Sequence, residues 1–116
     1  MDFYKLEKNS YLKGLNIKEN YEVYALEKNN IIIGYGILTE NNDNKIEIFI
    51  KEEYRGNGYG KYIFGKMIEE LKKEKYKEIK LTFKRDNYRI KNIIIYYGGL
   101  QLHTNEIEEI YILPIK

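Results

Sequence analysis

Cysteine is absent from the chain, and histidine occurs once, at His103. The lack of cysteine excludes disulfide bonds, thiolate zinc sites and a cysteine nucleophile. A single histidine also argues against a multi-histidine metal cage. The only proline, Pro114, marks no linker. The 116 residues are therefore expected to form one domain, residues 1–116, that needs no covalent or metal cross-link.

Neither an excess of charge of one sign nor a long hydrophobic run is present. The 20 basic and 18 acidic residues give a formal charge of +2, too balanced for a nucleic-acid-binding surface. The longest apolar runs, residues 31–33 and 93–97, fall far short of the roughly 20 residues that span a membrane. Charged residues near the N-terminus leave no apolar core of a signal peptide. We therefore expect a cytoplasmic protein that binds neither nucleic acid nor membranes.

Arginine is rare, whereas lysine, asparagine, isoleucine and tyrosine are abundant. The four abundant residue types have AT-rich codons, so the 13 tyrosines are no evidence for an aromatic function such as base stacking. Arginine occurs only at Arg55, Arg85 and Arg89. In a chain so rich in lysine, an arginine indicates a position where lysine would not serve, and Arg55 is a candidate.

The first half of the chain has the alternation and turn signals of β-strands. Strands are expected at residues 3–6, 21–26, 31–38 and 45–51, with turns at 28–30 and 41–44. Ser10 is suited to cap a short helical turn over residues 10–15. Gly34 and Gly36 interrupt a strand, which indicates a bulge or a close backbone approach. These segments predict an antiparallel meander.

The second half changes to helical spacing. Apolar residues recur at 63, 64, 67, 68 and 71, which is the spacing of an amphipathic helix. A second helix is expected over residues 90–97, ended by Gly98 and Gly99. Strands are expected at 79–84, 100–102 and 107–113. The fold class is therefore mixed α/β (α+β), with an antiparallel N-terminal meander, a central β-α-β unit and C-terminal strands.

One motif carries chemistry, the loop of residues 55–60 (RGNGYG) between a strand and a helix. Alternate glycines let a backbone turn tightly, and the helix behind adds unpaired N–H donors and the positive end of its dipole. Arg55 and Lys61 add positive charge on either side. The pattern suits a phosphate group, although alternating glycines can also form a plain strand-to-helix turn.

Two familiar phosphate loops fail on spacing. The dinucleotide fingerprint needs glycine at the sixth position, but counting from Gly56 this position is Lys61. The nucleoside-triphosphate loop needs a serine or threonine after its lysine, but Tyr62 follows Lys61. Neither loop is present.

The motif instead resembles the pyrophosphate loop of the GNAT superfamily, the acetyl-CoA-dependent N-acetyltransferases. That pattern is Arg or Gln, two residues, Gly, one residue, and Gly or Ala, and it is met by Arg55, Gly58 and Gly60. The resemblance extends over roughly residues 21–113, with a looser match from residue 87 to 100. It implies a GNAT-like fold, acetyl-CoA as cosubstrate, and acetyl transfer to a primary amine of a small molecule or peptide.

The resemblance also implies the cofactor-binding residues. Backbone N–H groups of the loop, from Arg55 to Gly60, would hold the CoA pyrophosphate. The strand end would splay from its neighbour and pair with the amides of the pantetheine arm. Asn87 would bond the cofactor or, alternatively, only cap the next helix. The implied set is Phe49, Ile50, Arg55, Gly56, Asn57, Gly58, Tyr59, Gly60, Lys61 and Asn87.

Catalysis needs a base, because only a neutral amine attacks a thioester. Glu47 is the candidate, since it lies on the strand beside the implied thioester and on the face opposite Ile46, Ile48 and Ile50. The alternative is that Glu47 is an ordinary solvated strand residue.

The acid that would protonate the leaving thiolate is less clear from the sequence. Family members often carry a tyrosine four residues before a Gly-Phe pair, and here that position is Ile95, a departure from the pattern. Tyr96, on one helical face with Arg89, is the candidate acid; Tyr97 is expected to belong to the core, and water is a third option. The departure leaves open a second function, a non-catalytic acetyl-CoA- or CoA-binding module.

The segment that would wall the acceptor site is short. Residues 8–20 have room for roughly three helical turns and include the poor helix formers Gly14 and Asn16. A thin wall leaves the acceptor cleft open. This predicts either a large acceptor or a homodimer that completes the cleft, with an edge strand at residues 107–113 as its contact.

Overall fold

The computed structural model describes residues 1–7, 20–40, 45–74 and 76–115. The helical turn expected over residues 10–15, the turn at 41–44 and most of the acceptor wall lie outside these ranges. Along the described chain the elements are β1 (Asp2–Lys5), β2 (Asn20–Lys28), β3 (Ile31–Glu40), β4 (Lys45–Ile50), the 3-10 turn η1 (Glu52–Tyr54), α2 (Tyr59–Lys73), β5 (Glu78–Lys84), α3 (Tyr88–Tyr96), β6 (Leu100–Thr104) and β7 (Glu108–Pro114).

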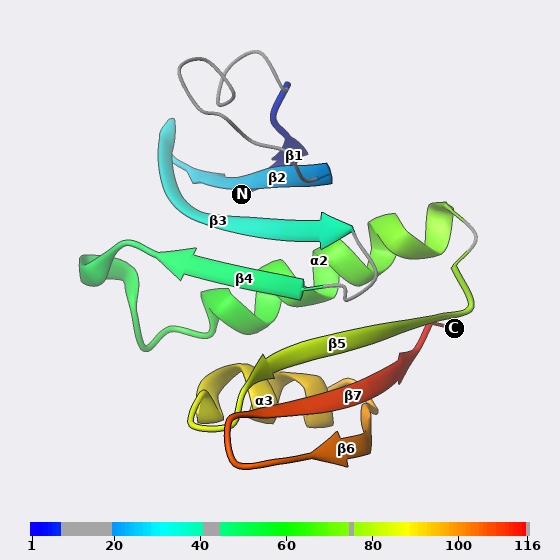
Figure 1. Ribbon diagram of the computed structural model, residues 1–116. Coiled ribbons are helices and arrows are strands. Elements are labelled where there is room, and N and C mark those ends of the chain that lie inside the picture. The colour runs from blue at the N-terminus through cyan, green and yellow to red at the C-terminus, as the bar shows by residue number, and fades with distance from the viewer. Residues whose placement is uncertain (8–19, 41–44, 75, 116) are drawn as a thin grey trace.

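The strands form two antiparallel sheets, in the orders β1-β2-β3-β4 and β5-β7-β6. The first sheet is the expected meander. β4 and β5 run in the same direction side by side where the sheets meet, with α2 as the connection between them (Figure 1). No ladder of hydrogen bonds joins these two strands in the part of the chain that the structure describes. The expected β-α-β unit is therefore present, with its strands splayed apart.

The helix α2 packs on the first sheet through the apolar face that the sequence predicts. Ile63, Phe64 and Met67 are almost fully buried. Gly36 of β3 lies directly beneath this face, because a Cβ there would come within 2.8 Å of the Ile63 side chain. Both features expected from the two glycines are present: the close approach lies at Gly36, and a register shift lies beside Gly34. Leu26 of β2 pairs with Gly34 and Glu27 pairs with Ile32, so Ile33 is the extra residue of a bulge in β3.

The helix α3 covers one side of the second sheet (Figure 1). Its buried residues Ile90, Ile93 and Ile94 recur at helical spacing, as expected. The Asn87 side chain caps its N-terminus, and Gly98, with φ +96°, follows its end. A positive φ is readily adopted only by glycine, so this residue stops the helix where the sequence predicts.

The expectation that residues 107–113 form an edge strand is wrong. β7 is the central strand of its sheet, paired with β5 on one side and β6 on the other. β6 is the edge strand at that end, and all of its residues are exposed. A homodimer remains a prediction, and in the described part of the chain the strand that could extend this sheet is β6.

Candidate active site

The glycine loop connects η1 to α2 and exposes a row of backbone donors. Gly56 and Gly58 have φ values of +82° and +81°, and Gly58 is the N-cap of α2. Among the described residues, none accepts a hydrogen bond from the backbone N–H groups of residues 56–61. Such a run of free N–H groups at a helix N-terminus is an anion-binding arrangement.

Arg55 and Asn57 hold the loop in this shape. Arg55 Nε donates to the Ile50 carbonyl oxygen at 3.0 Å, which ties the loop to the end of β4. Asn57 Nδ2 lies 3.3 Å from the Tyr54 oxygen and 3.4 Å from the Arg55 oxygen. One detail of the expected cofactor contacts is wrong: the Arg55 N–H is already donated to the Glu52 oxygen at 3.2 Å, because it closes η1. The free donors begin at Gly56.

The side chains of Tyr59, in the loop, and Lys61, just after it, contact the rest of the molecule. The Tyr59 hydroxyl accepts a hydrogen bond from Lys28 Nζ at 2.8 Å, which joins the loop to the β2–β3 hairpin and raises the pKa of Lys28. Lys61 Nζ lies 3.8 Å from the centre of the Tyr96 ring. Both residues still line the cavity at the loop.

A chain of three cavities, here called the β4 cleft, runs along β4 from this loop. The loop cavity, about 280 Å³, shares Arg89 and Ile93 with a second cavity of about 240 Å³ between β4 and α3. The second shares Ile46, Glu47 and Asn87 with a third of about 300 Å³, toward the ends of β5 and the start of β7. The cleft thus follows the gap between the splayed strands.

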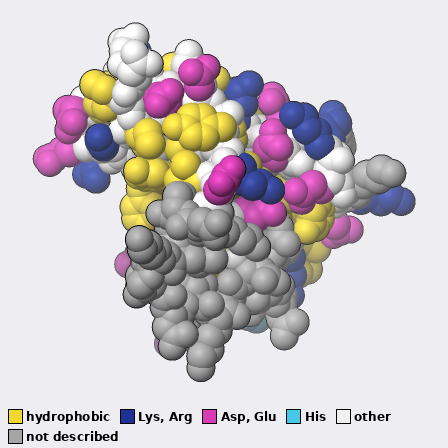
Figure 2. Space-filling model, turned by 90° about the horizontal axis from the view of Figure 1, so that it is seen from above, with side chains coloured by type: hydrophobic (Ala, Val, Ile, Leu, Met, Phe, Trp, Pro, Cys, Tyr) yellow, Lys and Arg dark blue, Asp and Glu magenta, His cyan; other side chains and the backbone are white. Residues whose placement is uncertain are grey.

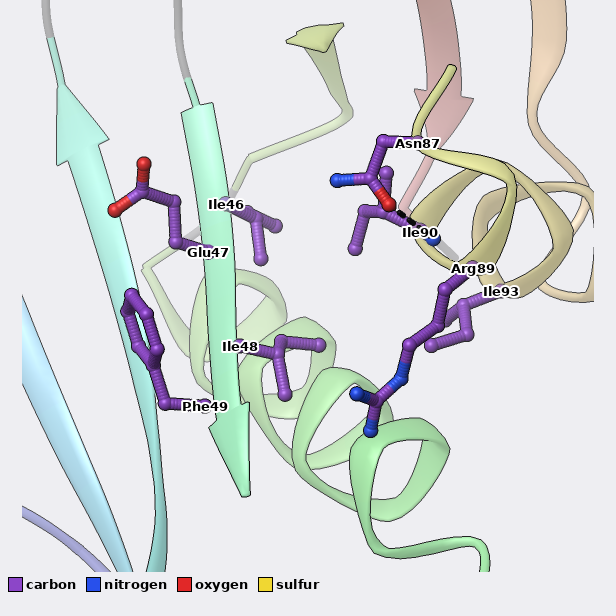
Figure 3. A pocket seen from close by; sticks show the side chains of 8 residues that line it. All are labelled: Ile46, Glu47, Ile48, Phe49, Asn87, Arg89, Ile90 and Ile93. Atoms are coloured by element: carbon purple, nitrogen blue, oxygen red, sulfur yellow. Dashed lines mark hydrogen bonds between the residues drawn. The ribbon is translucent and has the colours of Figure 1, made fainter. Parts of the chain in front are cut away.

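Figure 3 shows the middle of this cleft. Ile46 and Ile48 point across it toward α3. Asn87 Oδ1 accepts a hydrogen bond from the Ile90 N–H at 3.2 Å, while its amide nitrogen points toward β4. The two roles weighed for Asn87 are therefore compatible, because the oxygen caps α3 and the nitrogen remains as a donor for a ligand.

Glu47 lies where the second and third cavities meet. It is exposed, whereas Ile46 and Ile50 are buried, so the predicted division of the β4 faces is confirmed. Its carboxylate points away from α3, on the same side as Phe49, whose exposed fraction is 54%. The ion pairs found among the described residues leave this carboxylate unpaired. At about 3.3 Å per residue, Glu47 is roughly 10 Å along β4 from Ile50.

Tyr96, the last residue of α3, and Tyr97, its C-cap, line none of the three cavities of the β4 cleft. Tyr96 has an exposed fraction of 64%. It follows Asn87 by nine residues, which is about 13 Å along a helix axis. The structure therefore does not bring Tyr96 and Glu47 together. Tyr97 packs against the core as expected, and its hydroxyl donates to the Lys61 oxygen at 3.0 Å. Burial raises the pKa of Tyr97, so it stays protonated at neutral pH.

Arg89 is a cleft residue that the implied site does not contain. It lines both the loop cavity and the cavity between β4 and α3. In a chain so rich in lysine, an arginine indicates a position where lysine would not serve, and this argument applies to Arg89 as well as to Arg55.

In the described part of the chain, no cluster of His, Asp and Glu could hold a metal ion, and no helix is long and apolar enough to cross a membrane. On the face that Figure 2 shows, basic and acidic side chains are interspersed rather than separated by sign.

The sequence matches the model of the Acetyltransferase (GNAT) family over residues 2–92. The chain belongs to this family. Acetyl-CoA is the acyl donor of GNAT acetyltransferases. A search of curated proteins by sequence found no match.

Solved structures share the fold at low sequence identity. A Bacillus anthracis acetyltransferase in complex with acetyl coenzyme A is 22% identical, with a TM-score of 0.69 over 96% of this chain and 69% of that one. A chimera of the Vibrio cholerae spermidine N-acetyltransferase is 13% identical, with a TM-score of 0.72 over 98% and 96%. The Escherichia coli ribosomal-protein-S18-alanine N-acetyltransferase is 15% identical, with a TM-score of 0.69 over 96% and 78%. The GNAT fold of this chain is thereby confirmed.

Proposed function

We propose that this acyltransferase moves the acetyl group of acetyl-CoA to a primary amine. The observation that carries the proposal is the β4 cleft, which has free backbone donors of residues 56–61 at one end and Glu47 at the other. The loop suits the pyrophosphate, the β4 edge suits the amides of the pantetheine arm, and the arm would bring the thioester to Glu47. Asn87 Nδ2 is a further donor along this path.

In the proposed reaction the acceptor nitrogen attacks the acetyl carbonyl carbon, a C–N bond forms, and the C–S bond to CoA breaks. Glu47 takes the proton that the ammonium must lose before it can attack. After the attack the nitrogen loses its second proton, and the departing thiolate takes up one proton. The products are an acetamide and the free thiol of CoA, with one net proton released to solvent. Water is the better donor for protonating the thiolate than the predicted Tyr96, because Tyr96 lines none of the three cavities.

The acceptor is the open part of this proposal. Among the structural relatives, one is a spermidine N-acetyltransferase and another a ribosomal-protein-alanine N-acetyltransferase, so one fold serves very different amines. A panel of spermidine, a lysine-containing peptide and a peptide with a free N-terminal alanine covers both classes. Release of the CoA thiol, followed with a thiol reagent, is the readout.

A non-catalytic CoA-binding module is the second candidate, favoured by the distance between Tyr96 and the cleft. Both candidates predict that acetyl-CoA at a hundred times its Kd raises the melting temperature by roughly 10 °C, because it binds the folded state. Only the enzyme releases thiol with an amine. Absence of any thermal shift at millimolar acetyl-CoA would contradict both.

Gly58→Val is expected to weaken acetyl-CoA binding at least tenfold, about 1.4 kcal/mol. A Cβ at Gly58 would have no protein atom within 4 Å, so the new side chain would extend into open space at the loop and obstruct a ligand there. Gly98→Val is the matched control, because Gly98 also has positive φ and open space but lies outside the β4 cleft. Both variants should lose about 1–2 kcal/mol of stability through backbone strain. Equal CoA affinities of the two variants in calorimetric titration would refute the phosphate role of the loop.

A further inference from the structure

The guanidinium of Arg89 lies close to the N-terminus of α2, beside the glycine loop. It belongs to the first turn of α3, and its guanidinium extends toward the N-terminal turn of α2 (Figure 3). Arg89 Nη2 is 2.9 Å from the point where a Cβ on Gly60 would lie, and Cζ and Nε are 3.6 Å from it. The absence of a side chain at Gly60 is what lets the guanidinium come so close to the start of α2.

This position is electrostatically unfavourable for the protein alone. The N-terminus of a helix carries the positive end of its dipole, so it attracts anions and repels cations. Arg55 and Lys61 line the same cavity and add to the positive potential. Within the described ranges, no carboxylate forms an ion pair with Arg89. A bound anion would relieve this repulsion and accept hydrogen bonds from both the guanidinium and the loop.

The geometry points to Arg89 as a phosphate-binding residue that closes the loop site from the side of α3; we propose that its guanidinium grips the CoA pyrophosphate opposite the N–H groups of residues 56–61. This rests on the proposed use of acetyl-CoA. Arginine suits the task because its planar fork can donate two parallel hydrogen bonds to phosphate oxygens, which a lysine cannot do. Arg89 also lines the neighbouring cavity, so it stands where the diphosphate would pass into the pantetheine arm.

Titration of CoA into the parent, Arg89→Ala, Arg89→Lys and Arg85→Ala tests the assignment. Loss of a charged hydrogen-bonding group predicts a roughly tenfold to hundredfold weaker Kd for Arg89→Ala, with Arg89→Lys between it and the parent. Arg85→Ala is the matched control. It removes the same charge four residues earlier, where Arg85 donates to the Asn105 oxygen at 3.4 Å and lines neither cavity. This control should stay within twofold of the parent.

A donor without phosphates separates a phosphate contact from a merely structural role. S-acetylpantetheine has the same acyl arm as acetyl-CoA but no phosphate group. Arg89→Ala should lower kcat/KM for acetyl-CoA at least tenfold more than kcat/KM for S-acetylpantetheine. An equal loss with both donors, or a CoA affinity within twofold of the parent, overturns the assignment. If Arg89→Ala does not fold, Arg89→Lys decides in the same assays. Failure of the parent itself to bind CoA would instead refute the proposed function.

Discussion

Glu47→Gln is expected to lower turnover at neutral pH by about a hundredfold or more, within the usual range for loss of a general base. The amide keeps the size of the side chain but does not take a proton. The carboxylate points away from α3 and, in the proposed complex, would face the acetyl end of the cofactor and not its phosphates, so Kd for acetyl-CoA should stay within about twofold of the parent. The loss should therefore appear in kcat rather than in cofactor affinity.

The pH profile distinguishes a base from a residue that only shapes the site. Amino groups of ordinary pKa, about 10.4 for lysine and about 8 for an α-amine, are mostly protonated at pH 7. Without a base, the rate should follow the fraction of neutral amine and rise steeply with pH, so the gap between variant and parent narrows toward high pH. Glu78→Gln, an exposed position at the start of β5, is the control for loss of one surface charge. Unchanged turnover of Glu47→Gln from about pH 6 to pH 9 would transfer the role to water or another residue.

Local patterns in the sequence predict most of the elements and the loop. Alternation in residues 45–51 sets the two faces of β4, and the spacing of Ile63 and Met67 sets the buried face of α2. Positive φ values at Gly56 and Gly58 are what alternating glycines indicate. Each of these features depends on interactions within a few residues, which is why a single sequence is enough to find them.

Features that depend on distant pairing are the ones that the sequence does not predict. β7 reads as an edge strand because a hairpin with β6 is all that local signals show. Its second partner, β5, precedes α3 in the sequence and is therefore distant from β7 along the chain. No local pattern predicts that pairing. The same limit applies to the N–H of Arg55. The linear motif places it among the free donors, but in the folded chain this N–H closes η1.

Helical periodicity also gives the face of a residue but not its place along the axis relative to other elements. Tyr96 and Arg89 are seven residues apart, so they share a face of α3. They are about 10 Å apart along the helix axis. At this distance Arg89 lies beside the β4 cleft, whereas Tyr96 lies beyond it. A tyrosine predicted from the face alone therefore lies outside the β4 cleft, where Tyr96 lines none of the three cavities. Arg89 lies in the first turn of α3, and its position beside the glycine loop follows only from the packing of α3 near α2.

A largely buried ion pair joins α3 to β7, and its removal predicts the largest loss of stability. Lys91 Nζ lies 3.2 Å from Glu109 Oε1, with exposed side-chain fractions of 28% and 4%. The Thr104 hydroxyl donates to the same oxygen at 3.4 Å, while the buried Glu109 Oε2 has no partner among the described residues. Lys91→Met would leave this carboxylate buried without a counter-charge. We expect a loss of about 3 kcal/mol in the free energy of unfolding.

A double-mutant cycle separates the cost of the orphaned charge from the value of the pair. Lys91→Met combined with Glu109→Leu removes both charges, and such replacements of buried pairs are often neutral or stabilising. The double variant should therefore recover most of the stability that Lys91→Met loses in urea unfolding. Lys72→Met, which removes a charge from an exposed residue of α2, is the control and should change stability by less than about 0.5 kcal/mol. Because the pair joins α3 to β7, Lys91→Met should also weaken CoA binding through Asn87 and Arg89. If the single and double variants are equally unstable, the loss comes from packing of the lysine stem and not from the buried carboxylate.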